Sequence, residues 1–373
     1  MIGQPRQPHV VIAHDFSPTF GGAERIAAEI AAEFPEAEFW SLFGTREVAA
    51  RMGVSDRFAS VIPEWRPIVR HFRLLAPVYP AVVRARRLPA ADVLLTSSFA
   101  FAHGFRTEND APQVCYCYSP LRFAWTMTSQ YRDRFASGRV GSTAFAGFAS
   151  LMRGIDRRAA ANVTRYVAES HYVADQIRTF YGRDADVVWP PVDTELFRQG
   201  PPGHDGYFLF CGRLVEPYKR PTLVVDAFRA LPKLRLLVAG DGPELDRLRR
   251  SAPPNVEFLG QLSDDRLVPL MQRAAAVVFP SVDDFGLIPV ETMACGRPVI
   301  AYAAGGALET IVAGETGEFF DAQELPPLVA AIEGFDPDAY DPVRIRLHAE
   351  GWGAPRFRTA IREIVEEVAG ESG

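Results

Sequence analysis

Short apolar runs alternate with helical patterns along the second half of the chain, and this alternation restricts the fold more than any other feature. The runs are five to seven residues long: YFLFC at 207, LRLLVAG at 234, VEFLG at 256, AAVVFP at 275 and PVIAY at 298. They begin roughly 20 to 27 residues apart, which leaves room for one helix after each strand. Continuous apolar strands that alternate with amphipathic helices are typical of a parallel sheet covered on both faces. We therefore predict an α/β, doubly wound, Rossmann-like domain over residues 191–353.

The first half repeats this pattern less regularly. We expect strands at HVVIA (9), AEFWSLF (37), DVLLTSS (92), PQVCYCYS (112), RYVAES (165) and ADVVWP (185). A glycine pair at 21–22 follows the first strand and opens a helical pattern with Ile26, Ile30 and Phe34 on one face. A chain of 373 residues exceeds what one core usually supports. We predict a second Rossmann-like domain over residues 1–190, facing the other across a cleft.

The predicted boundary lies in WPPVDTELF at 189–197, where paired prolines end the last strand of the first half. The segment QGPPGHDG follows before the next sheet starts. Residues 354–370 form a terminal amphipathic pattern. The sequence leaves open whether this helix packs back on the first domain or on the second.

Composition excludes several classes of protein. The net charge is -6 and the pI is about 5.7, which argue against a nucleic-acid-binding surface. The four cysteines form neither a CxxC pair nor a zinc spacing, so reduced thiols are expected. The chain has no signal-like start and no apolar run near the roughly 18 residues that span a bilayer. We expect a cytoplasmic protein whose membrane contact, if it has one, is peripheral.

Two cations, Arg213 and Lys219, come directly after the strand YFLFC. Ligands of open parallel sheets bind beyond the carboxyl ends of the strands, so this loop faces the predicted site. Arginine offers a planar fork to phosphate oxygens and lysine a compact charge, so the pair can neutralise a diphosphate without a metal. The spacing alone fits two solvated loop cations equally well.

The segment PSVDDFGLIPVETMACGRPVIAY at 280–302 is the most informative one. Gly286 gives backbone freedom, and Pro289 suits the first turn of a helix that carries Glu291. We expect Glu291 near the helix N-terminus, beside backbone N–H groups that can receive a phosphate. Asp283 and Glu291 would repel a diphosphate, so hydroxyl groups are their expected partners. Helix capping and a turn are the competing interpretations.

The sequences GRLVEPYK, VAGDGPE and DDFGLIPVETMACGRPVIA together resemble the retaining glycosyltransferases of family 4, which have the GT-B fold. The resemblance implies that Arg213 and Lys219 hold the donor diphosphate, Glu291 the ribose and Asp283 the donor sugar. Asp283 stands where the family usually has glutamate, which shortens its reach by one methylene. The resemblance also implies a set of donor-binding residues with close backbone approach, namely Gly22, Gly240, Phe285, Gly286 and Leu287.

On the N-terminal side, HDFSPTFGGAER resembles the glycine loop of the family, with Gly22 as the residue of closest approach. CYCYSPLRFAW resembles a segment of polysaccharide mannosyltransferases whose histidine lies near the reacting sugar. Tyr118 occupies that position here and is the fourth expected catalytic residue, with Arg213, Lys219 and Asp283. Tyrosine cannot supply imidazole chemistry, so either His14 or His103 compensates or the histidine is dispensable.

The function implied by the resemblance is transfer of a hexose with retention of configuration, without metal or cofactor. Mannose from GDP-mannose is the expected donor, and a polysaccharide or a lipid-linked oligosaccharide the expected acceptor. The alternatives are a UDP-sugar donor, a sugar-nucleotide epimerase, and an inactive sugar-nucleotide-binding module. No GxGxxG fingerprint supports a dehydrogenase.

Two further segments match known binding patterns. Asp184-Ala185-Asp186 matches a metal-binding DxD element, but its place in a turn favours solvated carboxylates, and we predict no metal. Residues 66–88 mix six arginines with apolar residues. This segment fits contact with the anionic inner face of the cytoplasmic membrane, and it fits a solvated helical pair equally well, because two prolines interrupt it.

Overall fold

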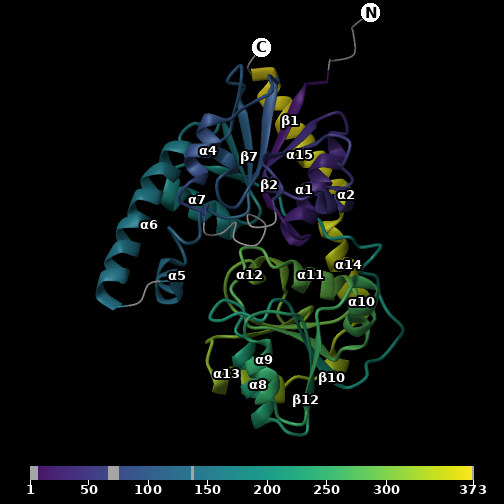
Figure 1. The fold of residues 1–373 in the computed structure, drawn as a ribbon. Coiled ribbons are helices and arrows are strands. Elements are labelled where there is room, and N and C mark those ends of the chain that lie inside the picture. The colour runs from purple at the N-terminus through teal and green to yellow at the C-terminus, as the bar shows by residue number, and fades with distance from the viewer. Residues whose placement is uncertain (1–6, 66–74, 136–137, 372–373) are drawn as a thin grey trace, which may run out of the picture. The chain divides into compact units, whose positions relative to one another are not determined.

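The computed structural model describes residues 7–65, 75–135 and 138–371, and these divide into two compact units (Figure 1). Unit 1 contains the described residues up to Trp189 and from Phe357 onward. Unit 2 is Pro190–Arg356. Each unit is built around its own parallel sheet.

The sheet of unit 1 has seven parallel strands in the order β3-β2-β1-β5-β7-β8-β9. Their bounds are β1 Val10–Ser17, β2 Glu38–Gly44, β3 Phe58–Ile62, β5 Val93–Ser98, β7 Gln113–Cys117, β8 Arg165–Ala168 and β9 Ala185–Val187. A separate pair joins β4 Arg87–Leu88 to β6 Arg106–Thr107. The six expected strands are confirmed. Strand β3 was not predicted, because its residues are all only half-buried at the edge of the sheet.

The sheet of unit 2 has six parallel strands in the order β12-β11-β10-β13-β14-β15. Their bounds are β10 Tyr207–Cys211, β11 Arg235–Ala239, β12 Val256–Gly260, β13 Ala276–Phe279, β14 Val299–Tyr302 and β15 Gly317–Phe320. The five expected strands are confirmed, and β15 is an addition. The order is the one typical of a doubly wound sheet, so the predicted α/β, Rossmann-like class is confirmed for both units.

Helices connect the strands and cover the sheets. In unit 1 they are α1 Gly22–Glu33, α2 Arg46–Arg51, α4 Tyr79–Ala85, η2 Ala102–Gly104, α5 Thr128–Phe135, α6 Gly138–Ala160 and α7 His171–Tyr181. In unit 2 they are α8 Pro221–Ala230, α9 Leu245–Arg250, α10 Asp264–Arg273, α11 Leu287–Ala294, α12 Ala307–Thr310, α13 Leu325–Glu333, η3 Pro337–Ala339, α14 Pro342–Ala349 and η4 Glu350–Trp352. None of the described helices combines the length and apolarity needed to cross a bilayer.

The terminal helix α15, Ala354–Glu371, belongs to unit 1 from Phe357 onward. The ring of Phe357 lies edge-on to Tyr116 of β7, with centroids 5.5 Å apart. Arg358 pairs with Glu29 of α1. The sequence left the place of this helix open, because its apolar face fits any apolar partner.

Both faces of the central strands are buried, which explains their continuous apolar sequences. In β10, Phe208 and Phe210 pack into the core on one face of the unit 2 sheet. Leu209, between them, points to the opposite face and is 0% exposed. The helices are stopped by local signals: α7 starts after Ser170, whose Oγ accepts from the N–H of Val173, and ends at Gly182 with φ of 66°.

Each sheet has one point where the strand order reverses. In unit 1 it lies between β1 and β5, and in unit 2 between β10 and β13. The connections that follow the two neighbouring strands leave toward opposite faces there, and a crevice opens at the carboxyl ends. This topology places the β10–α8 and β13–α11 loops side by side in unit 2.

Candidate functional site

The cations predicted from the sequence and the segment at 280–302 meet at the reversal point of the unit 2 sheet. Arg213 and Lys219 lie in the loop between β10 and α8, and Asp283 lies between β13 and α11. Strands β10 and β13 are neighbours in parallel register. The sheet order thus brings together residues that are 70 positions or so apart in sequence.

Lys219 and Asp283 form an ion pair. The Nζ of Lys219 lies 2.5 Å from Oδ2 of Asp283, and both side chains are mostly buried. The ammonium group also lies 4.9 Å from the ring centroid of Tyr218 and 5.8 Å from that of Phe279. The other carboxylate oxygen of Asp283, Oδ1, is buried and has no hydrogen-bond partner among the residues that the structure describes. An unpaired buried carboxylate oxygen is costly unless a ligand supplies a donor.

Arg213 differs from Lys219 because its side chain is exposed. Its guanidinium group makes no hydrogen bond or ion pair with any part of the chain that the structure describes. A free guanidinium beside a mostly buried ammonium group gives this loop an uncommitted positive charge. An anionic group with several oxygens fits such a loop.

Helix α11 starts at Leu287, directly after Gly286, which has φ of 88° and ψ of 77°. This left-handed conformation favours glycine, and it leaves the first N–H groups of the helix without intrahelical partners. Glu291 is the fifth residue of this helix, near its N-terminus as expected but in the second turn. The helix dipole acts mainly within the first turn, and its effect on Glu291 is correspondingly smaller.

Glu291 nevertheless lies close to the end of β10. Burial raises the pKa of the Cys211 thiol, and the negative charge of Glu291 raises it further, while Lys219 acts in the opposite direction. The three residues therefore share one electrostatic environment. Glu291 thus acts electrostatically on the same strand end as Lys219.

Three glycine positions near the site are explained by close backbone approach. A Cβ on Gly240, whose φ is 150°, would lie 1.9 Å from the carbonyl oxygen of Gly212. A Cβ on Gly306 would lie 2.1 Å from the carbonyl oxygen of Phe285, and one on Gly305 2.4 Å from that of Asp283. Gly305 and Gly306 were not singled out from the sequence. The sequence held an indication of this, because a glycine pair shortly after the strand VIAY favours tight packing against a neighbouring loop.

A second link between the two loops was also missed. The guanidinium group of Arg220 donates to the carbonyl of Gln323 over 2.7 Å. The amide of Gln323 in turn donates to the carbonyl of Pro280 over 2.7 Å. Arg220 has φ of 53°, which is unusual for a residue other than glycine. These contacts hold the chain on either side of the Lys219–Asp283 pair.

In unit 1 the residue at the reversal point is Asp15, which sequence reasoning overlooked. Its carboxylate accepts the backbone N–H groups of residues 99–102 at 2.6 to 2.7 Å, and the hydroxyl of Ser98 at 3.2 Å. Asp15 is 0% exposed. Five donors on one buried carboxylate fix the loop after β5. An aspartate at the end of a buried strand was the signal for it.

Tyr118 is held in a chain of buried hydrogen bonds. His14 Nδ1 lies 2.9 Å from Ser97 Oγ, and Ser97 Oγ lies 2.8 Å from the hydroxyl of Tyr118. That hydroxyl donates to the carbonyl of Ala23 over 3.1 Å. Burial raises the pKa of Tyr118 well above its usual range, so the hydroxyl stays protonated at neutral pH. Its role in this geometry is to hold the start of α1.

The predicted glycine loop leads into α1, whose first residue is Gly22. The N–H of Gly21 donates to Glu24 Oε2 over 2.8 Å, and Glu24 is 7% exposed. His14 Nε2 is 3.9 Å from the other oxygen of Glu24. One donor at this helix N-terminus is therefore already used by the chain itself.

His103, the second histidine considered in place of the missing one, lies elsewhere in unit 1. Its Nδ1 is 3.2 Å from Ser98 Oγ and its Nε2 is 3.2 Å from Asp156 Oδ1. It contacts neither His14 nor Tyr118 in the described interactions. The structure thus separates the two histidines, with only His14 linked to Tyr118.

The DxD-like triplet is part of β9 and the turn before it. Asp186 pairs with Arg165, and Asp184 pairs with Arg178 and is 92% exposed. The arginine-rich segment at 66–88 lies partly outside the described residues, because 66–74 are not described. Its described part contains α4 and the exposed side chains of Arg84, Arg86 and Arg87.

Two family models match the chain in succession. The model described as Glycosyltransferase Family 4 matches residues 20–196. The model described as Glycosyl transferases group 1 matches residues 192–335. The second match contains every unit 2 residue of the site described above.

Individual proteins are similar over different lengths. D-inositol 3-phosphate glycosyltransferase of Mycobacterium tuberculosis is 33% identical over 196 residues, which cover 45% of this chain and 40% of that protein. The aligned region thus spans about two fifths of the length of this curated relative. The crystal structure of Anabaena HepE in complex with UDP-glucose superposes with a TM-score of 0.70 at 18% identity, over 96% of this chain and 99% of that one. Sucrose-phosphate synthase from Thermosynechococcus elongatus gives 0.70 at 16% identity, over 97% and 100%.

Proposed function

The chain belongs to the family 4, group 1 glycosyltransferases of GT-B fold, and on that premise we propose that it transfers a hexose from a nucleotide sugar to a hydroxyl group of an acceptor, with retention of configuration. The donor binds at the reversal point of the unit 2 sheet. The acceptor is received by unit 1. The observation that carries the proposal is the pair of loops with Arg213, Lys219, Asp283 and Glu291 at the ends of β10 and β13.

The donor diphosphate is held by Arg213 and Lys219, with the N-terminus of α11 as a third positive element. The guanidinium group of Arg213 has no competing partner among the described residues, and Lys219 pairs with Asp283. The phosphates approach the backbone at Phe285, Gly286 and Leu287. Gly240 contributes through its close approach to the backbone of Gly212, at the start of the loop that carries Arg213 and Lys219, rather than by direct binding.

Two acidic residues orient the hydroxyl groups of the donor. Glu291 accepts from the ribose, and Asp283 accepts from the transferred sugar through Oδ1, the buried oxygen without a protein partner. Asp283 keeps its other oxygen on Lys219. This double role links the position of the phosphate-binding cation to the position of the sugar.

The reaction needs stabilisation of a leaving diphosphate more than it needs a nucleophile from the protein. Arg213 and Lys219 neutralise the charge that develops as the glycosidic bond breaks, which replaces the role of a metal. The acceptor hydroxyl attacks from the face that the diphosphate leaves, and a donor phosphate oxygen takes its proton. Tyr118 contributes by holding the first turn of α1, which begins at Gly22, and not as an acid or base.

The donor sugar is the finer part of the proposal. GDP-mannose is the first candidate, because CYCYSPLRFAW and GGAER resemble segments of mannosyltransferases. A UDP-sugar is the second candidate, because the similar Anabaena protein was crystallised with UDP-glucose. The acceptor class is a polysaccharide or a lipid-linked oligosaccharide, reached from the cytoplasmic side and with peripheral contact to an anionic membrane through the arginines of residues 66–88.

The test is a donor screen that follows release of GDP or UDP, with and without EDTA. We expect one nucleotide sugar to turn over and EDTA to leave the rate unchanged. Loss of transfer in EDTA would overturn the metal-free mechanism. Conversion of the sugar nucleotide without acceptor or diphosphate release would identify an epimerase, and binding without any turnover an inactive module.

A direct binding test uses the scarcity of lysine. Lys219 and Lys233 are the two lysines among 40 lysine and arginine residues. The free protein is treated with an amine-reactive reagent and analysed by mass spectrometry. The exposed Lys233 should be modified rapidly, and Lys219, which is mostly buried against Asp283, slowly but measurably. The correct nucleotide sugar should protect Lys219 and leave the exposed Lys233 reactive. Equal modification of Lys219 with and without every donor would contradict the assigned phosphate site.

A further inference from the structure

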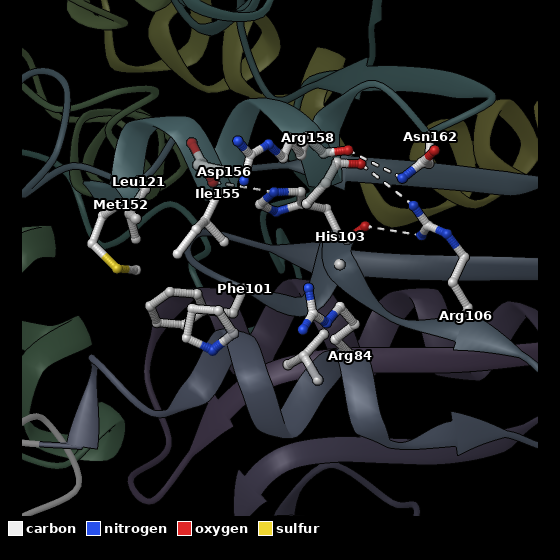
Figure 2. Close-up of a pocket in the computed structure, with 14 residues that line it drawn as sticks. Arg84, Phe101, His103, Arg106, Leu121, Met152, Ile155, Asp156, Arg158 and Asn162 are labelled. Atoms are coloured by element: carbon white, nitrogen blue, oxygen red, sulfur yellow. Dashed lines mark hydrogen bonds and ion pairs between the residues drawn. The ribbon is translucent and has the colours of Figure 1, made fainter. Parts of the chain in front are cut away.

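Unit 1 contains a cavity that takes no part in the proposed transfer site. It has a volume of about 210 Å³ and lies between α4, η2 and the C-terminal half of α6 (Figure 2). At about 30 Å³ for each water, the space could hold roughly seven waters, and it opens to solvent where the exposed side chains of Arg84 and Arg158 line it. A space of this size in an otherwise well-packed unit is suited to a ligand.

Apolar side chains form most of the wall. Phe101 and Leu121 come from the loops after β5 and β7, and Met152 and Ile155 from α6. In Figure 2 these four side chains lie together on one side of the cavity. Residue 151, one helical turn before Ile155 on the same stripe of α6, is a leucine that is 63% exposed. The apolar wall therefore continues onto an exposed surface.

Positive charge surrounds the same cavity. Arg84 comes from α4 and Arg158 from α6, on opposite sides of the space in Figure 2. Both side chains are exposed, and neither guanidinium group bonds to any described residue. Arg106 also lines the cavity, but it donates to the side chain of Gln113 and to backbone carbonyls. Two guanidinium groups thus remain available to an anion.

The one carboxylate in the wall is already neutralised. Asp156 Oδ2 accepts from Trp125 Nε1 at 2.6 Å and from the hydroxyl of Tyr181 at 2.8 Å. Its Oδ1 faces His103 Nε2 at 3.2 Å. Burial favours neutral His103, but the hydrogen bond and charge of Asp156 outweigh this and raise the pKa of His103 to about 8. The balance of charge around the cavity is positive.

Ser98, His103 and Asp156 have the composition of a hydrolytic triad, but the arrangement argues against that chemistry. Ser98 is 1% exposed, and its hydroxyl contacts the carboxylate of Asp15 at 3.2 Å. It does not line the cavity. A nucleophile must reach its substrate, so these residues provide structure and charge for a binding site rather than a reaction.

We propose that this cavity binds an anionic amphiphile. Its alkyl chain lies against Phe101, Met152 and Ile155, and its carboxylate or phosphate group pairs with Arg84 and Arg158. An apolar wall with an uncommitted pair of guanidinium groups at its edge matches this chemistry and disfavours neutral sugars and cations. The proposal is independent of sugar transfer, because none of these residues belongs to the unit 2 site.

Isothermal titration calorimetry on the full chain, below the micellar concentration of each probe, tests the proposal. The probes are dodecyl phosphate and dodecanoate, with dodecyl maltoside as the neutral control and butyl phosphate as the short-chain control. We expect one site per chain and binding of at least one anionic probe at least 10-fold tighter than either control. A preference between phosphate and carboxylate identifies the head group.

Variants locate the site. Ile155→Trp fills the cavity and should abolish binding, and Ala159→Leu is the milder filling variant if the first one is misfolded by circular dichroism. The double variant R84E/R158E should weaken binding at least 10-fold, whereas Arg139→Glu, on α6 but away from the cavity, should leave it unchanged. Equal binding of the neutral detergent, or unchanged binding by the filling variants, would overturn the proposal. Loss of affinity in Arg139→Glu equal to that in the double variant would assign the effect to general surface charge and would also overturn it.

Discussion

The reversal points of the two sheets carry polar residues that are used in opposite ways. In unit 1 the polar residues are buried and form hydrogen bonds within the protein, namely Asp15, Ser97 and Tyr118. In unit 2, Arg213 is exposed and uncommitted, and Asp283 keeps one oxygen without a partner. The same topology therefore gives an aspartate whose carboxylate is fully bonded in unit 1, and an aspartate with one oxygen unbonded within the described residues in unit 2. An incomplete set of polar groups indicates where a ligand is required.

The largest effect is expected from Asp15→Asn. The new amide group would face backbone N–H donors that now point at a carboxylate, so buried donors lose their partners. We expect the free energy of unfolding to fall by about 3 to 5 kcal/mol in urea denaturation. Asp92→Asn is the matched control, because Asp92 is exposed and accepts one backbone N–H from His9. If Asp15→Asn lowers the free energy of unfolding less than Asp92→Asn does, the loop after β5 does not depend on Asp15 for its conformation.

Lys219→Ala should show the reverse pattern, with lost activity and little change in stability. Removing one preorganised charge from a leaving group typically costs about 10²- to 10³-fold in turnover. We expect this loss in the release of nucleoside diphosphate, while thermal unfolding shifts little. Lys233→Ala should retain full turnover. An unchanged rate in Lys219→Ala would break the contrast between the two units.

The stability of unit 1 should depend on pH through His103. Its pKa is about 8 in the folded protein, against an ordinary value of 6.5. The folded state binds this proton more tightly, so the stabilisation is complete below pH about 6.5 and is lost as pH rises past 8. The expected loss between pH 6 and pH 9 is about 2 kcal/mol. The free energy of unfolding of His103→Gln in urea should lack this pH dependence. If this free energy falls with pH equally in both proteins, His103 is not its source.

The smallest effect is expected from Asp283→Asn, which should change nucleotide affinity and turnover in opposite directions. Release of Lys219 from its counter-ion should tighten binding of the free nucleoside diphosphate about 3- to 10-fold in calorimetry. Turnover should fall, because the sugar loses a carboxylate acceptor. Asp321→Asn, an exposed aspartate of the same unit, is the control. Weaker nucleotide binding in Asp283→Asn would mean that the carboxylate chiefly holds Lys219 in place.

The sequence alone predicted the architecture because it lies in local patterns. In a continuous apolar run such as YFLFC every side chain must be buried, which requires a strand that is covered on both faces. The helices between such strands impose a parallel sheet. It also predicted Arg213, Lys219 and Asp283 as members of one site, since strand ends meet at one edge. It missed β3 and β15, whose strands lie at the edges of their sheets and show weaker burial.

The tertiary structure decided how each polar group is used. Asp15 accepts hydrogen bonds from residues 99–102, Tyr118 donates one to Ala23, and Lys219 pairs with Asp283. No local pattern shows these contacts, because the partners lie far apart in sequence. The sequence determined which chemical groups reach the ends of the strands. Only the packing of loops from neighbouring strands determined which of those groups are already satisfied and which still need a ligand.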